Sequence, residues 1–176
     1  WLNGGYEKDI ITMIAGPPGS GKTNFSILAS CSQSKDNKKV IFIDTEGGFS
    51  VERVKQIVGE NPEKILENIF LLKPTNFEEQ KKCFEKLLIA VKKEQIGLIV
   101  IDGMAMLYRL ELGDAIHSKN DSNIREINRE IATQMRILAE ISRKQEIPVL
   151  ITNQVYSGFV SEEDWKKGLK GEVNIV

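Results

Sequence analysis

The eight residues 16–23, with the sequence GPPGSGKT, restrict the fold of this chain more than any other feature. They follow an apolar run at residues 10–15 and precede a stretch with helical patterning. Glycines in such a turn let several backbone N–H groups point to one centre, and the first turn of a helix adds partial positive charge. Because an ordinary strand-to-helix turn has no need of a Lys-Thr pair after three glycines, we interpret the segment as a phosphate-binding loop.

The side chains that close this loop are suited to a nucleoside triphosphate and a magnesium ion. We expect Lys22 to reach the β and γ phosphates and to assist catalysis, and the Thr23 hydroxyl to complete the coordination shell of Mg²⁺. The expected nucleotide-binding residues are Gly16, Pro17, Pro18, Gly19, Ser20, Gly21, Lys22, Thr23 and Asn24.

Short apolar runs alternate with helical patterns along the chain, as they do in βα units with a parallel sheet. The runs are rich in Ile and Val, which is typical of strands covered on both faces. With 41% hydrophobic residues among 176, the chain can bury one core but not two, so we predict one α/β domain spanning residues 1–176. Five parallel strands, with helices on both faces of their sheet, are predicted at residues 10–15, 40–43, 69–72, 98–101 and 149–152.

Two of the connecting helices have clear signals. Asn76 can cap the first, with Glu79 reaching back to it, and an apolar face then packs on the sheet. The second precedes the last strand and carries four arginines at other angles from its apolar stripe. These fit a solvated face, which is the rule for helices on a sheet, or alternatively a DNA-binding face. They are Arg125, Arg129, Arg136 and Arg143.

Polar residues come directly after three of the predicted strands. Because parallel strands place their carboxyl ends at one edge of the sheet, these residues and the phosphate-binding loop are expected to meet there. Asp102 would hold Mg²⁺ or its waters, and Glu46 would act as a base or orienting group for water on the γ-phosphate side. The amide of Gln154 could sense the γ-phosphate, whereas Asp44 could either cap the following turn or assist the metal. We therefore predict a magnesium-dependent nucleoside triphosphatase.

Composition excludes several other classes of protein. The net charge of -1, from 24 basic and 25 acidic residues, argues against binding nucleic acid by bulk positive charge. Cys31 and Cys83 have neither the spacing of a disulfide framework nor that of a zinc site, which favours a reducing compartment. No apolar run approaches the roughly 18 residues of a membrane span, and residues 1–9 do not resemble a signal peptide. We therefore expect a soluble, cytoplasmic protein without membrane contact.

Five segments together resemble the RecA/RadA recombinase superfamily, and within it a short archaeal paralogue group. They are GGYE at residues 4–7, GPPGSGKT at 16–23, IDTEGGFSVER at 43–53, LIVID at 98–102 and ITNQV at 151–155, so the resemblance covers nearly the whole chain. It implies a RecA-like core with strand order 3-2-4-5-1, whose closing strands lie beyond the end of this chain, and ATP as the nucleotide. It also implies that Glu46 activates water and that Gln154 links the γ-phosphate to a DNA-contacting loop.

The same resemblance makes residues 103–122 the first DNA-facing loop and residues 155–176 the second. Acidic side chains outnumber basic ones in both, so each offers at most a few phosphate contacts. Arg109 is the single best DNA-binding candidate, with a solvated loop residue as the alternative. In the second loop, Tyr156, Phe159 and Trp165 could stack on bases or could pack locally.

The motifs and charges of the sequence are compatible with three functions. The first is an accessory protein that binds ATP and single-stranded DNA, hydrolyses ATP weakly and assists the main archaeal recombinase RadA, with possible self-association. We prefer it because neither loop is basic and the chain contains no Phe-x-x-Ala polymerisation motif. The second is a full strand-exchange recombinase. The third is a P-loop kinase for a small acceptor, for which we find no lid of arginines.

Overall fold

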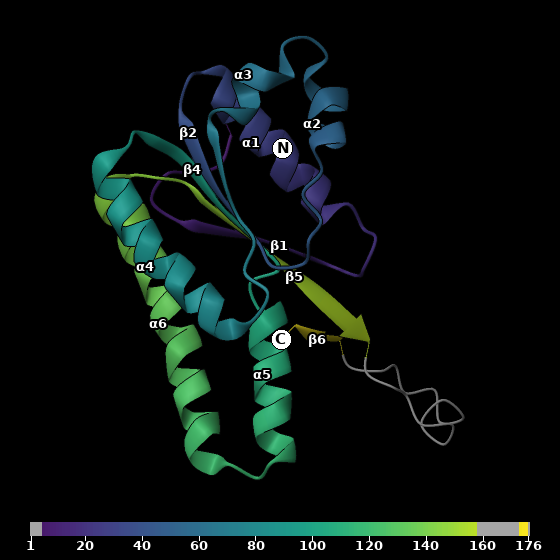
Figure 1. Ribbon diagram of the computed structural model, residues 1–176, viewed down its shortest axis with the longest axis vertical. Helices are drawn as coiled ribbons and strands as arrows, with labels where there is room; N and C mark the ends of the chain where they lie inside the picture. The colour runs from purple at the N-terminus through teal and green to yellow at the C-terminus, as the bar shows by residue number, and fades with distance from the viewer. Residues whose placement is uncertain (1–4, 158–172, 176) are drawn as a thin grey trace.

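The structure is a computed structural model that describes residues 5–157 and 173–175 of the chain. Helices flank a central sheet on both sides (Figure 1). The strands are β1 (Ile11–Gly16), β2 (Lys39–Asp44), β3 (Ile69–Leu72), β4 (Ile96–Asp102), β5 (Val149–Ser157) and β6 (Val173–Ile175). The helices are α1 (Lys22–Lys35), α2 (Val51–Val58), α3 (Pro62–Leu66), α4 (Phe77–Lys93), α5 (Met106–His117) and α6 (Asp121–Gln145). None of these helices is both long and apolar enough to cross a membrane.

The five predicted strands form one parallel sheet in the order β1-β5-β4-β2-β3. This is the expected order 3-2-4-5-1 read from the other edge, so the α/β fold and its topology are confirmed. The fifth strand is longer than predicted. The apolar pattern ends at the polar residues Asn153 and Gln154, but their backbones still pair with β1. The short antiparallel strand β6 was not predicted, because it forms only by pairing with β5.

Alternating side chains on the strands build two cores, one on each face of the sheet. On one face Val40, Phe42 and Val100 pack with α1, α2 and α3. On the other face Ile41 and Ile99 pack with α4 and α6. This alternation is the period-2 pattern of a strand, and it explains why the predicted strands read as continuous apolar runs.

The start of α4 differs in one detail from the prediction. Asn76 caps the helix as expected, since its Oδ1 accepts a hydrogen bond from the backbone N–H of Glu79 at 2.8 Å. The Glu79 carboxylate does reach back, but to Thr75: it accepts hydrogen bonds from the backbone N–H and the hydroxyl of that residue, at 2.7 and 2.8 Å. These two donors lower the pKa of Glu79 from its usual value.

The long helix α6 buries its apolar stripe and exposes the four arginines singled out from the sequence. Their exposure fits the solvated-face interpretation. A buried polar pair was not foreseen: Gln80 of α4 and Gln134 of α6 are both fully buried and joined by an amide–amide hydrogen bond of 2.8 Å. This pair fixes the two helices relative to each other at a point that an apolar pattern cannot specify.

Residues 103–122 are not a loop, contrary to the prediction. They contain all of α5, and α6 already begins at Asp121. The helix forms because Leu107 and Ala115 are buried against Phe77 and Ile127, on α4 and α6. This helix could not be predicted from a local pattern, because α5 has little separation of polar and apolar faces and its contacts come from distant parts of the chain.

Candidate nucleotide-binding site

The loop between β1 and α1 owes its shape to glycine. Gly19 and Gly21 have φ of 76° and 87°, in the left-handed region, and a Cβ on either would meet nothing within 4 Å. These two glycines are therefore required by the backbone conformation. At Gly16, a Cβ would lie 2.7 Å from Ser20 Oγ, so a larger residue there would require the Ser20 hydroxyl to turn away.

The Lys22 side chain lies inside this loop. It is only 7% exposed, and its ammonium donates hydrogen bonds to the carbonyl oxygens of Gly16 and Pro17, both at 2.9 Å. The positive charge is thus held at the centre of the turn, beside the first backbone N–H groups of α1. Such a concentration of donors and positive charge suits a phosphate group.

Thr23, in the first turn of α1, contacts the carboxylate at the end of β4. Its hydroxyl donates to Asp102 Oδ2 at 2.7 Å. The other oxygen of Asp102 accepts from the hydroxyl of Thr152 at 2.6 Å, and Thr152 in turn accepts from the Gly103 N–H at 2.8 Å. Asp102 is 1% exposed, so these two hydroxyls fix the orientation of a buried carboxylate. Thr152 is not among the predicted site residues, because its only signal in the sequence is a polar residue at the end of an apolar run.

The turn after β2 is organised by Asp44. Its two carboxylate oxygens accept from the N–H groups of Gly48 and Phe49, each at 3.0 Å, so of the two roles considered for Asp44 the structure contains the cap. The cap brings the Gly48 backbone against Thr23 and Asp102: a Cβ on Gly48 would lie 3.3 Å from Thr23 Oγ1 and 3.7 Å from Asp102 Oδ2. Gly48 therefore permits the close approach of this turn to the Thr23–Asp102 pair.

Glu46 and Gln154 meet at the same edge of the sheet. Gln154 Nε2 donates to Glu46 Oε2 at 2.8 Å, although the two residues are 108 positions apart. The Glu46 side chain lies against Gly103, where an added Cβ would be 2.7 Å from Glu46 Cγ and 2.8 Å from Oε1. Thr45 ties the same region together, since its N–H and hydroxyl both donate to the Asp102 carbonyl, at 3.1 and 2.9 Å. The ends of β2, β4 and β5 are thus joined directly.

Arg109 does not lie in a loop. It is on α5 and half-buried, and its Nη2 donates to the main-chain carbonyl of Gln154 at 3.1 Å. Of the predicted second loop, residues 155–176, the structure describes only the parts that belong to β5 and β6. Phe159, Trp165 and the side chain of Tyr156 lie outside the described part of the chain.

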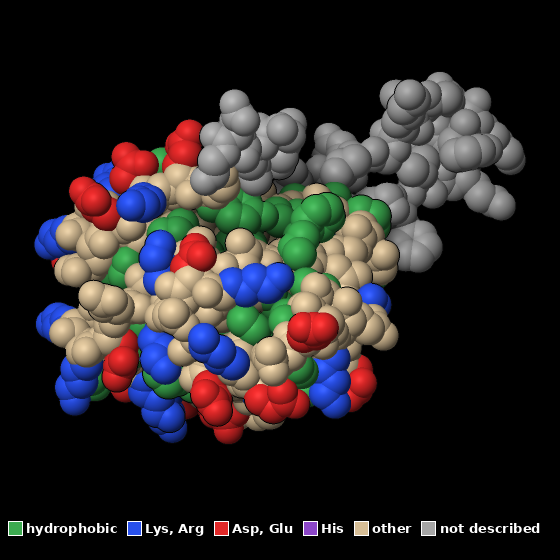
Figure 2. All heavy atoms as spheres, turned by 90° about the horizontal axis from the view of Figure 1, so that it is seen from above, with side chains coloured by type: hydrophobic (Ala, Val, Ile, Leu, Met, Phe, Trp, Pro, Cys, Tyr) green, Lys and Arg blue, Asp and Glu red, His purple; other side chains and the backbone are tan. Residues whose placement is uncertain are grey.

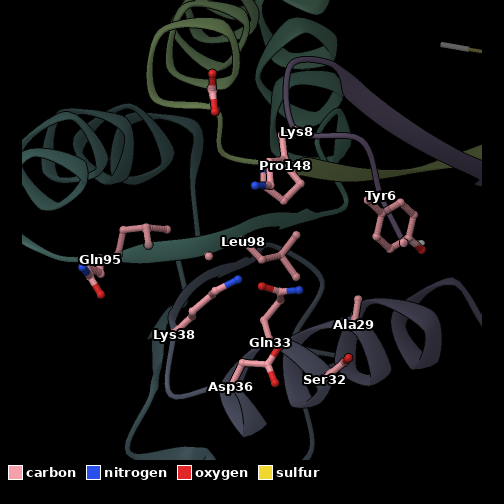
Figure 3. A pocket seen from close by; sticks show the side chains of 14 residues that line it. Tyr6, Lys8, Ala29, Ser32, Gln33, Asp36, Lys38, Gln95, Leu98 and Pro148 are labelled. Atoms are coloured by element: carbon pink, nitrogen blue, oxygen red, sulfur yellow. The ribbon is translucent and has the colours of Figure 1, made fainter.

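One sizeable cavity lies away from this edge. It measures about 690 Å³ and lies at the opposite end of the strands, between the end of α1 and the start of β4, where Gln33, Lys38 and Gln95 line it (Figure 3). A smaller hollow of about 220 Å³ is lined by Asn24 and Ile27 of α1, by Gly48 and Ser50 of the turn after β2, and by residues of α2.

The donor set at Thr23 and Asp102 fits magnesium. Within residues 5–157 and 173–175 no group of three or more His, Cys, Asp or Glu side chains could hold a metal ion. Mg²⁺ does not need such a cage, because it keeps several waters and takes one or two protein oxygens together with substrate phosphates. A hydroxyl and a buried carboxylate 2.7 Å apart beside a phosphate-binding loop match that preference.

These features define the class of protein: an α/β P-loop core of the RecA type, with its polar residues collected at the carboxyl edge of the sheet. The chain belongs to the Rad51 family, whose model matches residues 1–173. It is 46% identical over 154 residues to the DNA repair and recombination protein RadB of Methanococcus maripaludis strain C7, covering 88% of this chain and 68% of that protein.

Two further relatives carry the same name. The RadB of Methanobrevibacter smithii is 39% identical over 175 residues, covering 98% of this chain and 71% of that protein. The RadB of Methanocaldococcus jannaschii is 42% identical over 154 residues, covering 88% and 69% respectively. The expected resemblance to the RecA/RadA recombinases, and among them to an archaeal paralogue, is confirmed.

Proposed function

We propose that this chain forms the nucleotide-binding core of an ATP- and DNA-binding recombinase paralogue in homologous recombination and DNA repair. In this proposal it hydrolyses ATP weakly with Mg²⁺ and assists the main recombinase, RadA. The relatives named DNA repair and recombination protein support the cellular role. The observation that carries the proposal is the 2.8 Å hydrogen bond between Glu46 and Gln154, because a P-loop fold alone does not require an acid paired with an amide beside its phosphate-binding loop.

ATP binding falls to the loop at residues 16–24. Main-chain N–H groups and the Lys22 ammonium bind the phosphates, and Thr23 and Asp102 hold Mg²⁺ directly or through its waters. The ion supplies charge neutralisation on the phosphate oxygens. Thr152 keeps the Asp102 carboxylate oriented, so that the metal-binding oxygens are positioned before nucleotide arrives.

Hydrolysis depends on Glu46 in this proposal. Its Oε2 accepts from the Gln154 amide, while Oε1 lies over the Gly103 backbone. The carboxylate therefore takes the proton of a water with one oxygen while the amide fixes the other. Gln154 of β5 connects this acid to the second DNA-facing segment, which begins at the next residue.

DNA binding falls to Arg109, α5 and the segment after β5. The surface offers no large field of one sign on the face seen in Figure 2, where Lys and Arg side chains are interspersed with Asp and Glu. We therefore propose few phosphate contacts and a correspondingly modest, salt-sensitive affinity for single-stranded DNA.

An ATPase assay of the full-length protein, with and without single-stranded DNA and beside a strand-pairing test, examines this function. We expect slow, Mg²⁺-dependent hydrolysis and no homologous pairing by the protein alone. Pairing by the purified protein would identify a full strand-exchange recombinase instead. Phosphate transfer to a nucleotide or metabolite acceptor would identify a kinase, and either result would contradict the proposal.

A further inference from the structure

We propose that Arg109 is a positioning residue for hydrolysis: it holds the β5 backbone at Gln154 so that the amide of this residue stays hydrogen-bonded to Glu46. This assigns Arg109 a task within the molecule that does not depend on DNA. The inference rests on the proposed function only in giving Glu46 a catalytic task; the hydrogen-bonded connection itself concerns the nucleotide-free protein.

The first step of the argument is the direction of the β5 carbonyls. Successive carbonyls of a strand point to opposite sides, so the carbonyls of Thr152 and Gln154 point to the same side. On that side the Thr152 carbonyl accepts from the backbone N–H of Met104 at 3.1 Å, just after β4 has ended. The Gln154 carbonyl therefore also faces the side from which β4 has turned away.

The second step is that Arg109 supplies a donor to this carbonyl. Residue pairing between β4 and β5 stops at Ile101 and Ile151, so no β4 residue is paired with Gln154. Arg109 Nη2 donates to the Gln154 carbonyl at 3.1 Å from α5. On the β4 side of β5, the last backbone donor is the Met104 N–H on the Thr152 carbonyl. Two residues further along, the Arg109 guanidinium donates to the Gln154 carbonyl on that side.

The third step connects this carbonyl to the acid. The same residue whose carbonyl is held by Arg109 uses its side chain to donate to Glu46 Oε2 at 2.8 Å. Two consecutive hydrogen bonds therefore connect α5 to Glu46. A displacement of α5 would move the backbone at Gln154 and with it the amide that fixes the carboxylate.

The test compares Arg109→Gln, Arg109→Lys and Gln154→Ala in the full-length protein, with Arg136→Gln as the control for loss of an exposed arginine. Hydrogen–deuterium exchange of the nucleotide-free protein is followed at residues 44–49 and 152–157. We expect faster exchange in both segments for Arg109→Gln, a smaller increase for Arg109→Lys, and no change for Arg136→Gln. Unchanged exchange in Arg109→Gln would overturn the proposed connection.

Single-turnover ATP hydrolysis without DNA provides the second measurement. Loss of one charge-assisted hydrogen bond is expected to lower the rate by about tenfold, with the affinity for ATP changed by less than about twofold. In the Gln154→Ala background, Arg109→Gln should lower the rate by less than about twofold further, because its route to Glu46 is already gone. A full additional loss in that background would show that Arg109 acts by general destabilisation, and the proposal would be wrong.

Two further outcomes separate this inference from the proposed function. If Arg109→Gln lowers only the affinity for single-stranded DNA, with exchange and DNA-free hydrolysis unchanged, Arg109 is a DNA contact and the positioning role is excluded. If the wild-type protein hydrolyses no ATP, the proposed ATPase fails, while the exchange at residues 44–49 still decides whether Arg109 positions Glu46.

Discussion

Thr23 and Asp102 are 79 positions apart in the chain, yet their side chains share a hydrogen bond of 2.7 Å. In the sheet, β5 lies between the strand that leads to Thr23 and the strand that ends at Asp102. The contact therefore passes across β5, and the Thr152 hydroxyl of that strand donates to the same carboxylate. Residues of α1, β4 and β5 thus meet at one buried acid.

Lys22→Ala is expected to weaken ATP binding about 10- to 100-fold, because hydrogen bonds of a charged group contribute about 1.5–3 kcal/mol. Calorimetric titration with a slowly hydrolysed ATP analogue measures this loss. Lys35→Ala, at the far end of the same helix, is the control and should leave the affinity unchanged. Wild-type affinity in Lys22→Ala would contradict the role of the phosphate-binding loop.

Glu46→Gln is expected to slow hydrolysis by about 100- to 10,000-fold, the range for loss of a general base, while ATP still binds. The amide keeps the shape of the side chain, so the phosphate-binding loop is not disturbed. Glu60→Gln, an exposed acid after α2, is the control. Wild-type turnover in Glu46→Gln would remove Glu46 from the reaction.

Gly103→Ala is expected to lower both stability and turnover. Its φ of 86° costs about 1–2 kcal/mol for a residue with a Cβ, and that Cβ would lie 2.5 Å from Thr45 Oγ1 and 2.7 Å from Glu46 Cγ. Gly113→Ala, inside α5 with nothing within 4 Å, should instead raise the free energy of unfolding by about 0.5–1 kcal/mol. Denaturant unfolding of both variants tests the opposite signs.

Thr152→Val is expected to lower the free energy of unfolding by about 1–3 kcal/mol, because it removes the hydroxyl that donates to Asp102 Oδ1 and accepts from the Gly103 N–H, while Thr23 still donates to Asp102 Oδ2. Thr133→Val is a matched control, since the Thr133 hydroxyl donates to the carbonyl of Arg129 one turn earlier in the same helix. Equal stability losses in the two variants would argue against a special role for Thr152.

The Glu79 carboxylate predicts a specific pH dependence. Because Thr75 lowers the pKa of Glu79 in the folded protein, the ionised group stabilises the fold above its unfolded pKa of about 4.3, and this contribution is lost as the pH falls through the folded pKa. Glu79→Gln should therefore be less stable than the wild type at pH 7, with a difference that narrows below about pH 4. Glu85→Gln, in the middle of the same helix, is the matched variant for loss of one acid from α4.

Much of the fold followed from local patterns. Apolar runs placed all five parallel strands, and the Asn76 signal placed the start of α4, because strands and helix caps depend on residues close in sequence. The order of the strands followed from the resemblance to the recombinases. The prediction of a loop at residues 103–122 was wrong because α5 gains its stability from Phe77 and Ile127 and not from its own pattern.

The sequence by itself determined the phosphate-binding loop and the acids at the strand ends, since a GPPGSGKT turn and a carboxylate after an apolar strand are local chemical signals. Only the tertiary structure decided how these residues are held: Thr152 on Asp102, Gly103 beneath Glu46, and Arg109 on the carbonyl of Gln154. Each of these contacts joins segments brought together by the parallel sheet, whose pairing depends on distant strands. The sequence specifies the type of each side chain, but the order of the strands in the sheet decides which side chains become hydrogen-bond partners.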